Sequence, residues 1–297
     1  MRAPSGKALK LGFGIFVALS VLVFAASFLG VHLSVSGGHG QVALVRVEGK
    51  IMDARNTVEE IRRFERNPRI RALVLRVDSP GGGVVPSQEI HDAVVNFKAA
   101  GKPVVTSMGT VAASGGYYVA APSDVIMANP GTLTGSIGVI MTTVNLEGLM
   151  DKVGVENITI KAGKNKDIAS PFRQMTDAER RLLQEVMDDI HAQFIEAVAD
   201  GRGRTIDEVK PMADGRIFSG RQAMEQGLVD ELGTLDEAIE KAGKLAGIEG
   251  RPRVVEFHPS PLQELLGGAK QMFPWLPSAL NGTPVWTQVR ALYMMSL

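Results

Sequence analysis

Short apolar runs rich in β-branched residues alternate with amphipathic stretches from Gln41 to Gly247. The expected strands are residues 42–47, 72–77, 103–108, 124–128, 138–141 and 158–161. The run at 72–77 is almost continuously apolar, which is typical of a strand covered on both faces. Strands separated by helical patterns predict repeated βαβ units. We therefore expect an α/β domain built around a mainly parallel sheet.

The amphipathic stretches predict the helices that connect these strands. Asn56 and Glu59 have the spacing of a capping box. Thr176 and Glu179 repeat that spacing ahead of a long stretch with apolar residues at helical intervals. The other expected helices are one with Pro86 at its first position, one of small residues from about 113, and two near 220–226 and 234–247.

The N-terminal part contains a run of 21 residues, from 11 to 31, without a charge. About 20 apolar residues are needed to cross a bilayer as a helix. Three positive residues precede the run, and a positive flank stays in the cytoplasm: Arg2, Lys7 and Lys10. We therefore expect a single membrane anchor, in contact with lipid, that leaves the rest of the chain outside a bacterial inner (cytoplasmic) membrane.

A cleaved secretory signal is the alternative for this segment, because Ala25, Ala26 and Ser27 supply small residues. The length of the run favours an anchor, since the apolar region of a signal peptide has only about 7–15 residues. The expected layout is a cytoplasmic end at 1–10, the anchor at 11–33, a linker at 34–40, a folded domain at 41–250 and a C-terminal tail at 251–297.

The composition excludes several classes of function. Lys plus Arg (32) equals Asp plus Glu (32), so no basic surface is expected for nucleic acid. The absence of cysteine removes disulfides, thiolate metal sites and a cysteine nucleophile. No His-Glu-x-x-His motif occurs, and neither a metal nor another cofactor is expected. The tail holds several prolines and both tryptophans, and its pattern does not choose between docking, membrane contact and disorder.

Three glycine-rich turns lie next to expected strands, where α/β folds place their ligands. They are residues 78–83, 112–118 and 134–138. Glycines in the first turn leave backbone N–H groups free to face an anion or an oxyanion. In the second turn, Ser114 stands where the dipole of the following helix favours negative charge on an attacking hydroxyl. Taken singly, each turn is also compatible with a purely structural role.

A nucleophilic serine needs a base, and none of the five histidines is placed beside a serine motif. A Ser–His–Asp triad stays compatible with the spacing, because triads assemble in space, but no Gly-x-Ser-x-Gly turn supports one. Lysine is the other candidate, in the run 161–167. A lysine acts as a base only in its neutral form, and at an ordinary pKa only about one lysine in 2,500 is neutral at pH 7. Burial is able to lower the pKa by about three units, which corresponds to disfavouring the ammonium form by ~4 kcal/mol.

Four of these segments, in this order, closely resemble the signal peptide peptidase A (protease IV) family. They are Asp78–Gly83, Ala113–Tyr118, Thr134–Gly138 and Lys164–Asp167, and the resemblance covers about residues 41–247. It implies a Clp protease/crotonase-like fold with a repeated β-β-α core. It also implies a serine peptidase with a Ser–Lys dyad, which makes 41–250 the peptidase domain.

The resemblance also assigns roles to single residues. Ser114 matches the nucleophile, and Lys166 matches the general base. Lys164 is the competing base and lacks the aspartate that follows Lys166. Ser136 matches the serine that orients the lysine, and the backbone N–H groups of two glycines match the oxyanion hole. These are Gly82 and Gly115.

In relatives the domain forms a ring or dome, with serine and lysine supplied by adjacent subunits. The resemblance therefore implies a homo-oligomer, with an octamer as the natural expectation for a short, single-domain form. The implied substrates are remnant signal peptides and other apolar peptides. Two alternatives stay open from the sequence: a catalytically inactive membrane scaffold on the same fold, and a crotonase-like acyl-CoA enzyme.

Overall fold

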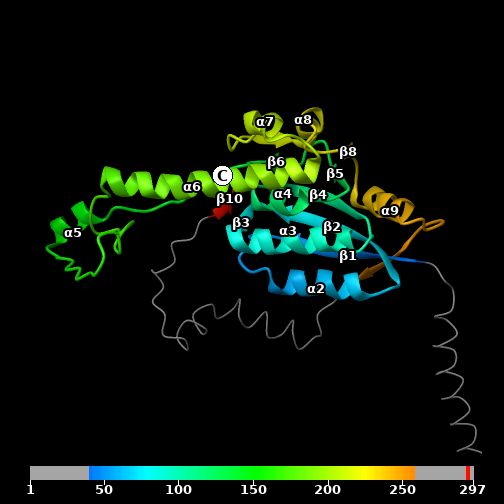
Figure 1. The fold of residues 1–297 in the computed structure, drawn as a ribbon, viewed down its shortest axis with the longest axis horizontal. Helices are drawn as coiled ribbons and strands as arrows, with labels where there is room; N and C mark the ends of the chain where they lie inside the picture. The colour runs from blue at the N-terminus through cyan, green and yellow to red at the C-terminus, as the bar shows by residue number, and fades with distance from the viewer. Residues whose placement is uncertain (1–39, 258–291, 295–297) are drawn as a thin grey trace, which may run out of the picture. The chain divides into compact units, whose positions relative to one another are not determined.

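The computed structural model describes residues 40–257 and 292–294. Its main sheet has eight strands: β1 (Gln41–Glu48), β2 (Ile70–Ser79), β4 (Val104–Ala113), β5 (Val125–Ala128), β6 (Leu133–Gly135), β7 (Ile217–Ser219), β8 (Glu231–Leu232) and β9 (Arg253–Glu256). They lie in the order β7-β6-β4-β2-β1-β9, with β5 between β4 and β8 (Figure 1). Every pair is parallel except β6 with β7. The prediction of an α/β fold with a mainly parallel sheet is confirmed.

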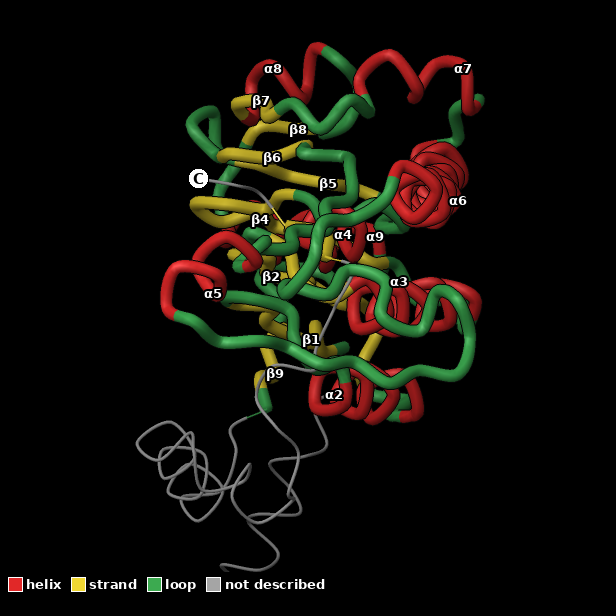
Figure 2. The backbone as a smooth tube through the Cα atoms, turned by 90° about the vertical axis from the view of Figure 1, so that its left-hand side faces the viewer, coloured by secondary structure: helices red, strands yellow, loops and turns green. Residues whose placement is uncertain are grey.

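Helices pack on both faces of this sheet. The helices of the described residues are α2 (Arg55–Arg66), α3 (Val84–Ala99), α4 (Gly115–Ala120), α5 (Glu147–Val153), α6 (Asp177–Arg202), α7 (Ile206–Val209), α8 (Gly220–Glu225) and α9 (Leu235–Leu245). A short 3₁₀ helix, η1, spans Lys210–Met212. One core cluster joins the sheet to α2, α3, α4 and the second half of α6, and a smaller one joins its other face to α9. Figure 2 shows α2, α3 and α6 on one side of the strands.

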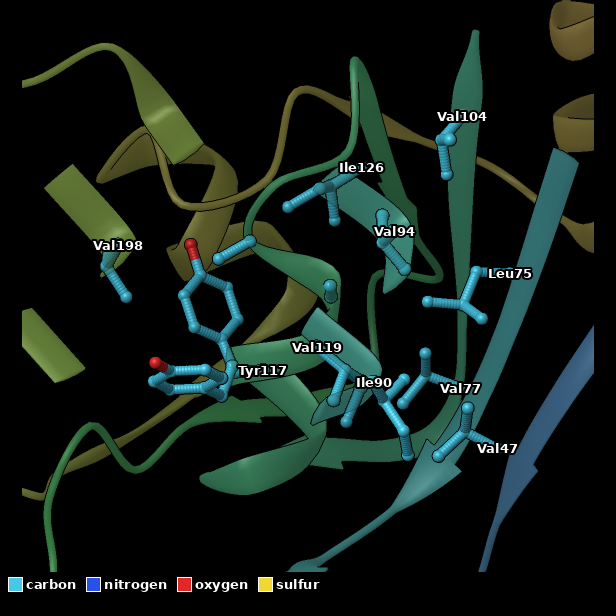
Figure 3. Close-up of a cluster of buried hydrophobic side chains, with 14 of the residues drawn as sticks. Val47, Leu75, Val77, Ile90, Val94, Val104, Tyr117, Val119, Ile126 and Val198 are labelled. Carbon is cyan, nitrogen blue, oxygen red and sulfur yellow. The ribbon is translucent and has the colours of Figure 1, made fainter. Parts of the chain in front are cut away.

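The larger cluster includes residues next to or within the glycine-rich turns, such as Val77 and Tyr117. Figure 3 shows Leu75 and Val77 of β2 facing Ile90 of α3, with Tyr117 on the opposite side of the cluster. Tyr117 is fully buried, and its hydroxyl donates to the Leu228 carbonyl (2.9 Å). Burial of this kind stabilises by about 25 cal/mol per Å² of apolar surface, so the turns are held by a well-packed core.

The first half of α6 is not part of either cluster. In this 26-residue helix the buried apolar residues are all in the second half, from Phe194 onward. The first half and α5 lie away from the sheet, on the left of Figure 1. A capping box begins α6: Thr176 Oγ1 accepts from the Glu179 N–H (3.2 Å), and the Glu179 carboxylate accepts from the Thr176 N–H (3.0 Å). This confirms the predicted helix start.

Four local predictions are wrong. Residues 138–141 and 158–161 form no strand, although Ile140 makes an isolated bridge, because β propensity takes effect only where a neighbouring strand pairs with the segment. Asn56 does not cap α2, since the helix begins one residue earlier and Asp53 Oδ1 accepts from the Arg55 N–H instead (2.8 Å). The helix after Ser114 begins at Gly115 rather than near 113, because β4 continues to Ala113.

A two-stranded antiparallel ladder lies beside the main sheet. It consists of β3 (Gly81–Gly83) and β10 (Leu292–Met294), with Tyr293 opposite Gly82. Residues 1–39 lie outside the described part of the chain, and with them the expected anchor at 11–33 and most of the expected linker. Among the residues that are described, no helix is both long and apolar enough to cross a membrane.

Burial raises the pKa of the Glu60 carboxyl on α2 from 4.5 to about 7. An acid whose pKa is raised by folding destabilises the fold as pH rises from about 4.5 to 7, because the folded chain must then lose a proton it holds more tightly. We expect Glu60→Gln to be more stable than wild type at pH 8 by about 1 kcal/mol after discounting for partial exposure, or roughly 2–4 °C in Tm. The difference should vanish near pH 4.

Thermal unfolding of the full-length protein at several pH values checks this, with the exposed neighbour Glu59→Gln as the matched control. Equal Tm values for wild type and Glu60→Gln at pH 8 would contradict the assignment.

Candidate active site

Ser114 lies directly after β4 and is the N-cap residue of α4. Its φ of 52° is positive, a conformation that costs a non-glycine residue about 1–3 kcal/mol. The Ser114 N–H donates to the Gly135 carbonyl (2.8 Å), and the Ser114 carbonyl accepts from the Tyr118 N–H (2.8 Å). The strained serine is thus held by a hydrogen bond to β6 through its N–H and by one to α4 through its carbonyl.

The Ser114 hydroxyl is fully buried, and its Oγ has no hydrogen-bond partner within the described part of the chain. Burying a polar group without a partner costs about 1–3 kcal/mol. Such groups are rare in folded proteins, and strained residues cluster at active sites. Two separate costs at one serine indicate a residue kept for its chemistry.

Gly82 presents its backbone N–H on the outer edge of β3. The Ile51 N–H donates to the Gly81 carbonyl (3.0 Å), and the Gly83 N–H donates to the Ile51 carbonyl (2.7 Å). Alternate residues of a strand direct these groups to opposite edges, so those of Gly82 face away from Ile51. A Cβ at position 82 would lie 2.1 Å from the Ile51 carbonyl oxygen, so only glycine fits at this position of β3.

Gly115 lies beside Gly82. A Cβ built on Gly115 would be 3.2 Å from the Gly82 nitrogen and 2.5 Å from Ser87 Oγ. The Ser87 hydroxyl, fully buried on α3, donates to the Gly83 carbonyl (2.8 Å). The structure therefore brings together the two glycines that the sequence predicts for an oxyanion hole. Ser87, which supports them, is a residue that sequence reasoning missed, because it belongs to no motif.

Ser136 lies next to Ser114 across the sheet. Ala113 pairs with Gly135 in the β4–β6 ladder, so the next residue on each strand is a serine. Ser136 has a φ of 51°, and its N–H donates to the Arg216 carbonyl (2.7 Å). The sequence placed these two serines in separate motifs, and the parallel register brings them side by side.

A cavity of about 660 Å³ opens beside Ser136. Its apolar lining comes from Val139, Ile140, Met187 and Ile217. Asp188 and Asp214 are among its polar residues, and Arg216 pairs with Asp214. The cavity gives a side chain from outside this chain room to reach Ser136.

Lys166 is placed away from Ser114. Lys166 is exposed, in the segment between α5 and α6, and its backbone N–H donates to the Gly163 carbonyl (3.2 Å). Arg173 joins the adjacent Asp167 to Glu179 in the first turn of α6. Lys164 lies in the same exposed segment.

The length of α6 shows how large the separation is. Phe194 packs against Tyr118 of α4, with ring centroids 5.0 Å apart. Glu179 lies 15 residues earlier, or about 22 Å along the helix at 1.5 Å per residue. Within one chain, the structure therefore does not bring Lys166 to Ser114. The order of the motifs does not say which chain supplies each residue, whereas the family resemblance implies a serine and a lysine from adjacent subunits.

The two histidines in the described ranges, His91 and His191, contact other groups than Ser114. His91 packs against Tyr118 (5.0 Å between ring centroids), and burial lowers its pKa. His191 Nε2 lies 3.3 Å from the Ile137 carbonyl oxygen. Over the described ranges, no three His, Asp or Glu side chains gather in the arrangement that a metal ion needs.

Comparison with known proteins identifies the family of this chain. The model of peptidase family S49 matches residues 96–249, which include Ser114, Ser136 and Lys166. The chain belongs to peptidase family S49. The predicted resemblance to signal peptide peptidase A and protease IV is confirmed.

Relatives of this S49 chain carry peptidase names. It is 44% identical over 238 residues to a protein of Synechocystis named as a protease, which it covers to 85%. It is 39% identical over 189 residues to a protein of Enterococcus faecium named as signal peptide peptidase SppA, covering 55% of it. It is 33% identical over 263 residues to protease 4 of Salmonella typhi, covering 42%. These alignments include 78%, 64% and 83% of the present chain.

The contact between Gly115 and Ser87 yields a prediction about this S49 site. Gly115→Ala should lower peptidase activity by about 100-fold or more, because the new methyl displaces the start of α4 from Gly82. Adding Ser87→Ala removes the nearest clashing atom and should restore part of the rate. Peptide-cleavage assays on both variants test this, with Ser87→Ala alone as the control that keeps most activity. Wild-type rates in Gly115→Ala would contradict the geometry.

Proposed function

We propose that this chain is a membrane-bound serine endopeptidase whose nucleophile, Ser114, works with Lys166 of a second copy of the same chain. The observation that carries the proposal is the strained, buried and unpartnered hydroxyl of Ser114 beside Gly82 and Gly115. Membership of a peptidase family makes peptide hydrolysis the chemistry to assign to it. The parallel sheet with connecting helices supports a Clp protease/crotonase-like fold for the domain.

The proposed reaction follows from these positions. Neutral Lys166 accepts the Ser114 proton as the hydroxyl oxygen attacks the peptide carbonyl carbon. The N–H groups of Gly82 and Gly115 donate to the oxyanion, a contribution typically worth about 10²–10³ in rate per donor. The lysinium then protonates the leaving amine, and water activated by the same lysine hydrolyses the acyl-enzyme. Ser136 holds the lysine amine in position.

Two features support a base from a second copy. The separation along α6 keeps Lys166 away from Ser114 in its own chain, and the cavity beside Ser136 has room for an incoming side chain. Its lining includes Asp188, and the segment with Lys166 also carries Lys164, so these two charges are of opposite sign. A contact that repeats head to tail closes into a ring, and eight copies remain our expectation.

Exposed apolar residues on the projecting part of the chain support the same assembly. They are Val144, Leu149, Val153, Val155, Ile158, Ile160, Phe172, Leu182 and Val186. Ile160 is 96% exposed and Ile158 is 77% exposed. Exposed apolar surface of this extent is typical of a protein–protein contact, and a second copy of the chain is the occupant we propose. Its burial would also desolvate Lys166, which favours the neutral amine.

The proposed substrates are remnant signal peptides and other apolar peptides in extended conformation. The outer edge of β3 is able to pair with an antiparallel strand, as β10 does, and extended peptides are recognised by strand addition at such edges. The name of the Enterococcus relative supports signal peptides as the class. The uncharged run at 11–31 supports an anchor in the inner membrane, with the site on the extracytoplasmic side.

Mixing two inactive variants tests the shared site. Ser114→Ala and Lys166→Ala, each alone, should lose peptidase activity on a signal-peptide substrate. Co-assembly in equal amounts should restore about a quarter of the wild-type rate, since about one in four head-to-tail contacts then joins an intact serine to an intact lysine.

The matched control mixes Ser114→Ala with the double variant Ser114→Ala/Lys166→Ala, which should stay inactive. Acyl-CoA hydratase activity that persists in Ser114→Ala would favour an acyl-CoA type of chemistry, and a wild-type protein that neither cleaves peptide nor reacts with a fluorophosphonate would favour a scaffold. A failure of the mixed variants to recover would contradict the shared dyad.

A further inference from the structure

Arg173 ties the segment that carries Lys166 to the start of α6. Its Nε donates to Asp167 Oδ2 (2.9 Å), and its Nη1 donates to Glu179 Oε2 (2.9 Å). Its Nη2 reaches both the Asp167 carbonyl (3.2 Å) and Glu179 Oε1 (2.5 Å). One guanidinium therefore binds the side chain and the backbone of the residue next to Lys166, and also a carboxylate of the helix.

The helix end of this connection is firmly held. The Glu179 carboxylate also accepts from the N–H and the hydroxyl of Thr176 (3.0 Å each), which completes the capping box. Hydrogen bonds from Arg173 and then from the Thr176 backbone lower the pKa of Glu179 to about 2. The Glu179 side chain is only 8% exposed. Since α6 packs on the core from Phe194 onward, Arg173 fixes the Lys166 segment relative to the core through a rigid helix.

At the other end of this connection, the Asp167 carboxylate binds a second cation besides Arg173. Lys161 pairs with Asp167 Oδ1, so each oxygen of this carboxylate has a cationic partner. Hydrogen bonds from Arg173 and from Lys161 hold the pKa of Asp167 well below its usual range. The Asp167 side chain is 13% exposed, compared with 29% for Arg173. Asp167 remains ionised, and each of its carboxylate oxygens is paired with a cation other than Lys166.

This arrangement matters because Asp167 is the immediate neighbour of Lys166. A carboxylate near an amine favours the ammonium form, and a cation nearby disfavours it. The charged groups that contact Asp167 or Arg173 are Lys161 on the preceding stretch and Glu179 on α6, and Lys164 lies in the same loop. Because both oxygens of the Asp167 carboxylate are paired with Lys161 and Arg173, this carboxylate is not left free to pair with the Lys166 amine.

We propose that Arg173 is a positioning residue for Lys166, which sets the place of the lysine and keeps Asp167 from pairing with it. The inference rests on the proposed function, since it assigns a role around the proposed base. Arg173 belongs to none of the four sequence motifs, and only its contacts with Asp167 and Glu179 point to this role.

The test measures kcat and KM against pH for Arg173→Gln and Arg173→Lys in the full-length protein. In Arg173→Gln, kcat should fall roughly 10- to 100-fold with little change in KM, because the base is misplaced. The rise of kcat with pH should also move up by about one unit, because the released Asp167 stabilises the lysinium. Arg173→Lys keeps a cation but loses the planar fork, so kcat should fall while the pH profile stays in place.

Two further variants separate this role from a general loss of structure. Arg181→Gln removes an exposed arginine from the same helix and should leave both readouts unchanged. Arg173→Gln with Asp167→Asn should return the pH profile to its wild-type position while kcat stays low. A wild-type kcat and pH profile in Arg173→Gln overturns the proposal, and so does a fall in kcat without any shift of the profile. If Lys166→Ala itself retains activity, the proposed function fails instead.

Discussion

The close approach of α4 to the first glycine-rich turn is the contact on which the rest of the site depends. A Cβ on Gly116 would lie 2.6 Å from the Ser79 carbonyl oxygen, and one on Gly115 would lie 3.2 Å from the Gly82 nitrogen. Only glycines allow the backbone of α4 to lie this close to β3. The same contact forces the chain to turn sharply at Ser114, and this is where the strain and the unpartnered hydroxyl are found. The core beneath, around Tyr117 and Leu75, maintains a conformation that no local preference would choose.

Much of this arrangement was predictable from residue patterns. Parallel strands follow from apolar runs between amphipathic stretches, and the start of α6 follows from Thr176 and Glu179. Ser114 was identified because its motif and three others, in this order, resemble one family; the motif alone is also compatible with a structural role. The strands expected at 138–141 and 158–161 did not form. The first segment lines the cavity beside Ser136, where Val139 packs against the core, and the second is exposed on the projecting part of the chain.

The position of the base could not be obtained in this way. A motif states which residues occur and in what order, but the distance between Ser114 and Lys166 depends on the path of a long helix. The support of Lys166 by Arg173 was equally hidden, because an arginine in a polar segment looks like a solvated charge until its two carboxylate partners are seen. The proposed site is thus divided: a rigid core holds the nucleophile and the glycines, and a projecting segment holds the amine.

Cysteine cross-linking tests this division most directly, because the chain has no cysteine of its own. A mixture of Ser136→Cys and Lys166→Cys proteins, treated after assembly with a short bis-maleimide reagent that spans about the length of a lysine side chain, should give a covalent dimer on a denaturing gel. The double variant Ser136→Cys/Lys166→Cys should give a ladder of larger species. An internally bridged monomer from the double variant, with no dimer from the mixture, would contradict a lysine supplied by a second copy.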